Sequence, residues 1–142
     1  LDIFGDGTIR DQICSMIENK NYIKYKGTVP FEETPSILSY YHVLINTSAK
    51  EVSQGSPIKL FEYLASGRSI IHGWAPQVEE ILKNGEIGII YNNTVPDFVE
   101  KALFFINNPE QMELYAKKAK NEAHYHSWKR RLEKLYQKID EV

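Results

Sequence analysis

Short apolar runs alternate with segments of helical periodicity along almost the whole chain, and this alternation constrains the fold more than any other feature. Four runs have strand length: LDIF (1–4), HVLINTS (42–48), RSIIHG (68–73) and GIIYN (88–92). The segments between them carry apolar residues three and four positions apart, as amphipathic helices do. Strands that alternate with helices predict an α/β fold, a Rossmann-like parallel sheet with helices on both faces.

Length and composition place this sheet in an ordinary globular domain. The chain has 142 residues, 42% of them hydrophobic, which is enough for one domain with its own core. We find no linker, so we expect a single domain over 1–142. The sequence opens with LDIFGDG, inside a strand and without Met. We therefore expect a piece of a longer protein, truncated at its N-terminus.

Charge and cysteine content exclude some classes of function. The net charge is −2, and no basic face of the kind that binds nucleic acid is evident. Cys14 is the one cysteine, so the chain cannot form an internal disulfide. A single cysteine is compatible with a reducing compartment, and we expect a cytoplasmic location. The basic run 129–131 has two interpretations. It could make peripheral contact with the inner face of a membrane, or it could be an ordinary solvated surface.

The stretch GSPIKLFEYLASGRSII (55–71) predicts a helix that follows a small polar loop. Ser56 suits the N-cap, Pro57 the first turn, and Gly67 the left-handed position just past the end. The helix therefore runs from about residue 57 to residue 66. We expect its core side to consist of Ile58, Phe61, Leu64 and Ala65.

A second stripe on this helix is polar. In a parallel sheet, ligands bind at the carboxyl ends of the strands, where helices begin, and free amides at a helix start attract anions. Gly55 lets a ligand approach the backbone, and Lys59 adds a positive charge one turn in. Glu62 can accept hydrogen bonds from sugar hydroxyls, so the stretch fits a nucleotide. Lys59 and Glu62 also fit an ordinary surface pair.

The same stretch closely resembles the signature helix of retaining glycosyltransferases of family 4, which have the two-domain GT-B fold. Other segments resemble the family's donor-binding domain in the right order: FGDG (4–7), IKYKGTVPFEETPSILSYYHVLINTS (23–48), VEEILKNGEIGIIY (78–91) and HSWKRRLEKLYQKI (126–139). The resemblance covers nearly the whole chain and is most specific at the helix.

This resemblance implies site residues. Glu62 matches the second glutamate of the family's Glu-x7-Glu motif, which binds the donor ribose. Gln54 stands where the family has its first glutamate, which contacts the donor sugar, and the nearby Glu51 is an alternative. Gln54 and Glu62 are thus the candidate catalytic residues. The candidate residues for binding the nucleotide-sugar are Gly5, Gly7, Gly55, Ser56, Ile58, Lys59, Leu60 and Glu62.

The resemblance also implies a reaction. The intact enzyme would be a hexosyltransferase that moves a sugar from a nucleoside diphosphate to a glycan or lipid-linked acceptor, with configuration retained. No cofactor or metal is expected, because amides and basic residues can hold the diphosphate. The acceptor domain lies outside this chain, so the fragment alone should be inactive. A GT-B-type epimerase and a degenerate, non-catalytic binding module remain alternatives.

Several other residues invite functional readings. Gly5-Asp6-Gly7 lacks the third glycine of a dinucleotide fingerprint and fits a tight turn after a strand. His72 ends a strand and fits a satisfied structural histidine. Trp74 follows it in a loop and suits either stacking on a base or loop packing. His124 and His126 have too few neighbouring ligands for a metal site.

Overall fold

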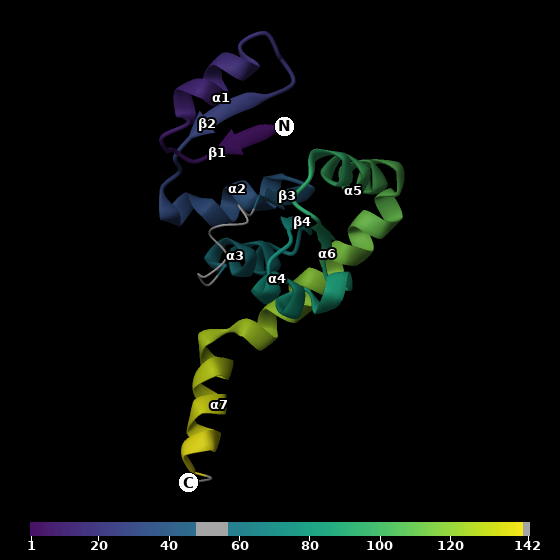
Figure 1. Cartoon of the computed structure of the whole chain (residues 1–142). Coiled ribbons are helices and arrows are strands. Elements are labelled where there is room, and N and C mark those ends of the chain that lie inside the picture. The colour runs from purple at the N-terminus through teal and green to yellow at the C-terminus, as the bar shows by residue number, and fades with distance from the viewer. Residues whose placement is uncertain (48–56, 141–142) are drawn as a thin grey trace. The chain divides into compact units, whose positions relative to one another are not determined.

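The computed structural model describes residues 1–47 and 57–140, in which helices and parallel strands alternate as predicted (Figure 1). The elements are β1 (Asp2–Phe4), α1 (Arg10–Ile17), β2 (Lys24–Gly27), η1 (Phe31–Glu33), α2 (Thr34–Tyr40), β3 (Val43–Asn46), α3 (Ile58–Ser66), β4 (Ser69–Gly73), α4 (Pro76–Ile81), η2 (Lys83–Gly85), β5 (Ile89–Tyr91), α5 (Val95–Asn107), α6 (Pro109–Ala123), η3 (His124–His126) and α7 (Trp128–Asp140). The chain forms two compact units, Leu1–Ser36 and Ile37–Val142, which are described separately below. The expectation of one domain stays a prediction.

The first unit is a strand–helix–strand element. β1 pairs with β2 in parallel, and α1 makes the connection between them. Gly5, at the end of β1, has φ +127°, a conformation that side chains with a Cβ rarely adopt. Its N–H donates to the carbonyl of Gly27 at 2.9 Å, which ties the glycine turn to the end of β2.

The second unit holds a three-stranded parallel sheet in the order β3-β4-β5. α3 connects β3 to β4, and α4 with η2 connects β4 to β5. In the register of the sheet, Asn46 lies opposite His72, and Gly73 lies opposite Tyr91. All three strands therefore end at the same edge, which we call the carboxyl edge.

Apolar side chains cover both faces of this sheet. Neighbouring residues on β4 point to opposite faces. Ile70 belongs to a cluster with Leu60 and Leu64 of α3, Val78 of α4 and Ala119 of α6. Ile71 belongs to a second cluster on the other side, with Ile89, Tyr91 and Phe105. The predicted sheet with helices on both faces is confirmed for this unit.

α3 ends as predicted, and its expected core side is confirmed in part: Leu64 is buried, and Phe61 packs against the same cluster. Gly67 adopts φ 64° and ψ 40°, and its N–H donates to the carbonyl of Leu64. The expected core positions Ile58 and Ala65 are wrong, because both are exposed, Ile58 at 68% of its surface. Leu60, which was not expected in the core, is fully buried one turn before Leu64. The sheet thus lies under a stripe centred on these two leucines, which leaves Ile58 on the open side of the helix.

Candidate functional site

The carboxyl edge of the second unit is the candidate site, because loops there can converge on a ligand. The chain leaves β3 at Asn46 and enters α3 at Ile58, leaves β4 at Gly73, and leaves β5 at Tyr91. Because α3 connects the end of β3 to the start of β4, its N-terminus belongs to this edge of the sheet.

Asn46 and His72 form a polar pair at the ends of β3 and β4. Nδ2 of Asn46 lies 2.7 Å from Nε2 of His72, and Nδ1 of His72 lies 2.7 Å from the carbonyl oxygen of Gly73. His72 is 1% exposed, and this burial lowers its pKa. Both ring nitrogens are thus occupied inside the protein, which confirms the reading of His72 as a satisfied structural histidine.

Glu62 lies on the second turn of α3. Its side chain is half-buried, and among the described residues it forms no ion pair, with Lys59 or with any other cation. The next residue, Tyr63, donates from its hydroxyl to the carbonyl of Ile45 at 3.2 Å and so fastens α3 to β3. Burial, with a smaller contribution from the Glu62 carboxylate, raises the pKa of Tyr63.

The first turn of α3 carries three of the candidate binding residues. Ile58 and Lys59 are exposed, whereas the side chain of Leu60 is fully buried. The N–H of Leu60 donates to the carbonyl of Pro57 at 2.9 Å. The amides of Ile58 and Lys59 precede the first intrahelical hydrogen bond, so they are the donors that this helix end can offer to an anion.

Several candidates cannot be placed against this helix. Gln54, Gly55, Ser56 and Glu51 lie outside the described residues. Gly5 and Gly7 are in the first unit, where the Tyr25 hydroxyl donates to the Gly5 carbonyl at 2.5 Å. The N–H of Gly7 donates to Oδ1 of Asp6 at 2.9 Å. This local bonding is typical of a tight turn after a strand.

Trp74 occupies the carboxyl edge directly after β4. Its N–H donates to the Tyr91 carbonyl at 2.8 Å, and its own carbonyl accepts from Nδ2 of Asn93 at 3.0 Å. The indole N–H donates to Oε2 of Glu79 at 3.3 Å, and 43% of the residue is exposed. Sequence reasoning singled out Trp74 but missed Asn46, Glu79 and Asn93, whose roles depend on strand register and on contacts across loops.

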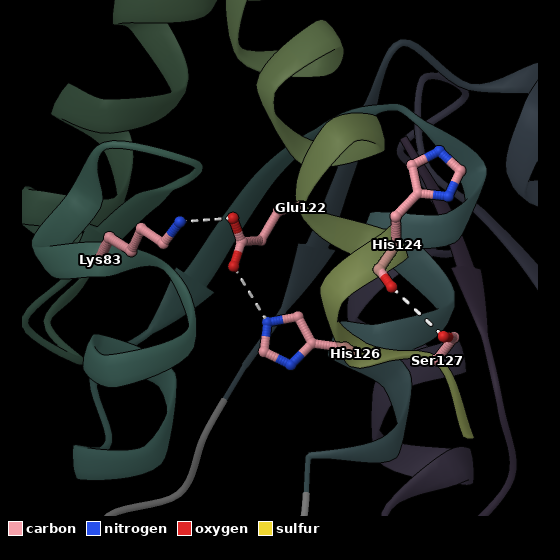
Figure 2. A network of polar contacts seen from close by, with 5 residues as sticks. All are labelled: Lys83, Glu122, His124, His126 and Ser127. Carbon is pink, nitrogen blue, oxygen red and sulfur yellow. Dashed lines mark hydrogen bonds and ion pairs between the residues drawn. The ribbon is translucent and has the colours of Figure 1, made fainter. Parts of the chain in front are cut away.

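A third polar cluster joins η2, α6 and η3 (Figure 2). The Glu122 carboxylate accepts from Nζ of Lys83 at 2.6 Å and lies 3.2 Å from Nε2 of His126. His124 takes no part through its ring, which points away from Glu122, while its carbonyl accepts from the Ser127 hydroxyl at 3.2 Å. Within residues 1–47 and 57–140, no group of three or more His, Cys, Asp or Glu side chains is arranged to hold a metal ion.

None of the helices in the described part of the chain combines the length and the apolar character needed to cross a membrane.

Known structures share this architecture at low sequence identity. The crystal structure of Anabaena Alr3699/HepE in complex with UDP and glucose aligns with 99% of this chain and 40% of its own, with a TM-score of 0.77 and 12% identity. The pneumococcal O-GlcNAc transferase GtfA in complex with UDP and GlcNAc aligns with 99% of this chain and 29% of its own, with a TM-score of 0.74 and 23% identity. The fold is that of a GT-B glycosyltransferase.

Sequence comparison gives the family. The model of the glycosyl transferase-like family matches residues 2–137, and the chain belongs to this family. A poly(ribitol-phosphate) alpha-N-acetylglucosaminyltransferase of Staphylococcus aureus (strain COL) is 29% identical over 112 residues, which are 75% of this chain and 22% of that protein. The chain therefore spans about a fifth of the length of this relative.

Proposed function

We propose that this chain is the donor-binding domain of a retaining glycosyltransferase of family 4. The longer protein would be a hexosyltransferase that moves a sugar from a nucleoside diphosphate to a glycan or lipid-linked acceptor held by a separate domain. The chain alone would bind the donor and transfer nothing. Two UDP complexes with the same fold, one containing glucose and one GlcNAc, make UDP-sugars the first donors to test.

The observation that carries the proposal is the position of Glu62. It lies one turn into a helix that starts from the carboxyl edge, and within the described residues no cation neutralises its carboxylate. A carboxylate accepts hydrogen bonds from two neighbouring hydroxyls well, as a ribose would present them. The exposed Lys59 and the amides of Ile58 and Lys59 supply positive charge for a diphosphate on the adjoining turn.

The remaining site residues belong to the proposal through the resemblance. Gly55 and Ser56 would line the approach to α3, and Gln54 or Glu51 would contact the donor sugar. By the same resemblance, Gly5 and Gly7 of the first unit are proposed to bind the nucleotide-sugar. An amide at position 54 can bond a hydroxyl but brings no charge to stabilise a cationic sugar in the transition state. We further propose a cytoplasmic protein, with the basic residues 129–131 available for peripheral contact with a membrane.

Nucleotide titration by NMR tests this function. We expect UDP, GDP or ADP to shift the amide resonances of Ile58 and Lys59 at millimolar concentration or below. Glu62→Ala should weaken that binding roughly tenfold, the scale of charge-assisted hydrogen bonds to hydroxyls. Glu113→Ala, an exposed carboxylate on α6, is the matched control and should leave binding unchanged.

Two results would contradict the proposal. If no nucleotide shifts any resonance at millimolar concentration, a non-catalytic binding module becomes the better description. If Glu62→Ala and Glu113→Ala bind a nucleotide equally well, the ribose does not lie against Glu62. An epimerase would instead bind the nucleotide normally and, as the full-length protein, invert a sugar centre without transferring the sugar to an acceptor.

A further inference from the structure

The backbone of Trp74 is fixed to the end of the sheet. The hydrogen bond from its N–H to the Tyr91 carbonyl extends the β4–β5 pairing by one residue. The side-chain amide of Asn93, in the loop after β5, donates to the Trp74 carbonyl. Asn93 has φ 56°, a left-handed conformation that asparagine tolerates better than most residues. The loop after β5 is thereby turned back onto the loop after β4, and Trp74 is held from both sides.

The ring of Trp74 makes a hydrogen bond of its own. Glu79, in the first turn of α4, accepts from the indole N–H, so the ring carries a half-buried carboxylate at its edge. The buried neighbours Ala75 and Val78 secure the loop and the helix from which these two side chains project. With 43% of Trp74 still exposed, the structure presents an aromatic surface bordered by a carboxylate at the carboxyl edge.

We propose that Trp74 and Glu79 form a sugar subsite, in which a pyranose ring stacks on the indole and a ring hydroxyl donates to Glu79. This inference rests on the proposed function only in expecting a sugar at this edge. A pyranose has an apolar face of C–H groups and a rim of hydroxyls, which matches an apolar surface bordered by a carboxylate. Because the two side chains are already hydrogen-bonded to each other, a sugar meets a partly formed site.

The charge of Glu79 favours a sugar over a phosphate at this position. A carboxylate repels a phosphate group but accepts hydrogen bonds from hydroxyls. The indole N–H donates to Oε2 of Glu79, and the second carboxylate oxygen is the acceptor that we assign to the sugar. A nucleobase could also stack on the indole, and the experiment below includes that alternative.

The second tryptophan provides a matched control. Trp128 on α7 is 76% exposed, and the guanidinium of Arg131 lies over its ring at 5.5 Å. The sequence contains no tryptophan besides these two, so a Trp128→Phe variant leaves Trp74 as the one source of an indole N–H resonance and of indole fluorescence. This variant reports directly on the proposed subsite without disturbing it.

The test titrates Trp128→Phe with methyl β-glucoside, methyl β-N-acetylglucosaminide and uridine. We expect one or both glycosides to shift the Trp74 indole resonance and to saturate at millimolar concentration. Trp74→Ala should weaken glycoside binding about tenfold or more, as loss of a stacking ring does elsewhere. Trp74→Phe should recover part of that loss, Glu79→Gln should weaken binding severalfold, and Trp128→Ala should bind like the wild type.

The outcomes separate this inference from the proposed function. If neither glycoside moves the Trp74 indole, or if uridine alone moves it, the sugar subsite is ruled out, even when UDP shifts Ile58 and Lys59 normally. If glycosides bind at Trp74 while UDP leaves α3 unaffected, the subsite stands and the donor site fails. Equal weakening by Trp74→Ala and Trp128→Ala would also overturn the subsite.

Discussion

His72 fixes the orientation of the Asn46 side-chain amide. The carbonyl of Gly73 can only accept, so Nδ1 of His72 carries the ring proton, and in the neutral ring Nε2 must then accept. Asn46 consequently turns its NH2 group toward His72, 2.7 Å away, and its oxygen away from the ring. This geometry holds the last residue of β3 just before the chain runs toward α3.

The first prediction concerns pH. Burial lowers the pKa of His72 below its ordinary value of 6.5, so the unfolded chain takes up a proton there more readily than the folded protein does. The contribution of neutral His72 to the free energy of unfolding should therefore be fully present above pH 6.5. It should be lost progressively as the pH drops from 6.5 through the lowered pKa. Urea unfolding at a series of pH values measures this decrease.

His72→Gln isolates the contribution of the histidine. Glutamine does not titrate, so the difference in unfolding free energy between wild type and variant should narrow as the pH falls below 6.5. A difference that stays constant across this range would show that His72 is not the group responsible. A ¹⁵N spectrum of the imidazole at neutral pH should in addition find the proton on Nδ1.

The second prediction identifies the buried face of α3. Leu64→Ala removes a fully buried side chain and should cost about 2–5 kcal/mol in the free energy of unfolding. Ile58→Ala, on the same helix but 68% exposed, should change it by about 0.5 kcal/mol or less. Denaturant melts of both variants compare the two positions. Comparable losses from both would mean that Ile58 is packed in the protein.

The third prediction concerns the Glu122 cluster. Glu122 is 8% exposed and is bonded to Lys83 of η2 and to His126 of η3, so Glu122→Ala removes both contacts at once. We expect a loss of about 1–3 kcal/mol, the range for hydrogen bonds to charged groups. Glu113→Ala removes an exposed carboxylate from the same helix and should be nearly neutral. Thermal unfolding of both variants checks this difference, and equal melting temperatures would contradict it.

Local patterns in the sequence predicted the elements of the fold well. The alternation of apolar runs and helical segments anticipated the parallel pairing of β3, β4 and β5, and Gly67 marked the end of α3 correctly. On α7 the large side chains of Leu132, Leu135 and Ile139 recur at helical spacing, yet all three are exposed. Periodicity shows which residues share a face of a helix, but it does not show which part of the protein packs against that face.

The sequence by itself determined the strand–helix alternation and the family of this chain, because these depend on periodicity, turn residues and motifs that are local along the chain. Only the tertiary structure decided that Leu60 rather than Ile58 faces the sheet, and that Asn46 meets His72 while Trp74 meets Glu79 and Asn93. Those contacts depend on how helix α3 is rotated against the sheet and on strand register. Both are fixed by the packing of the core as a whole, which no single segment specifies.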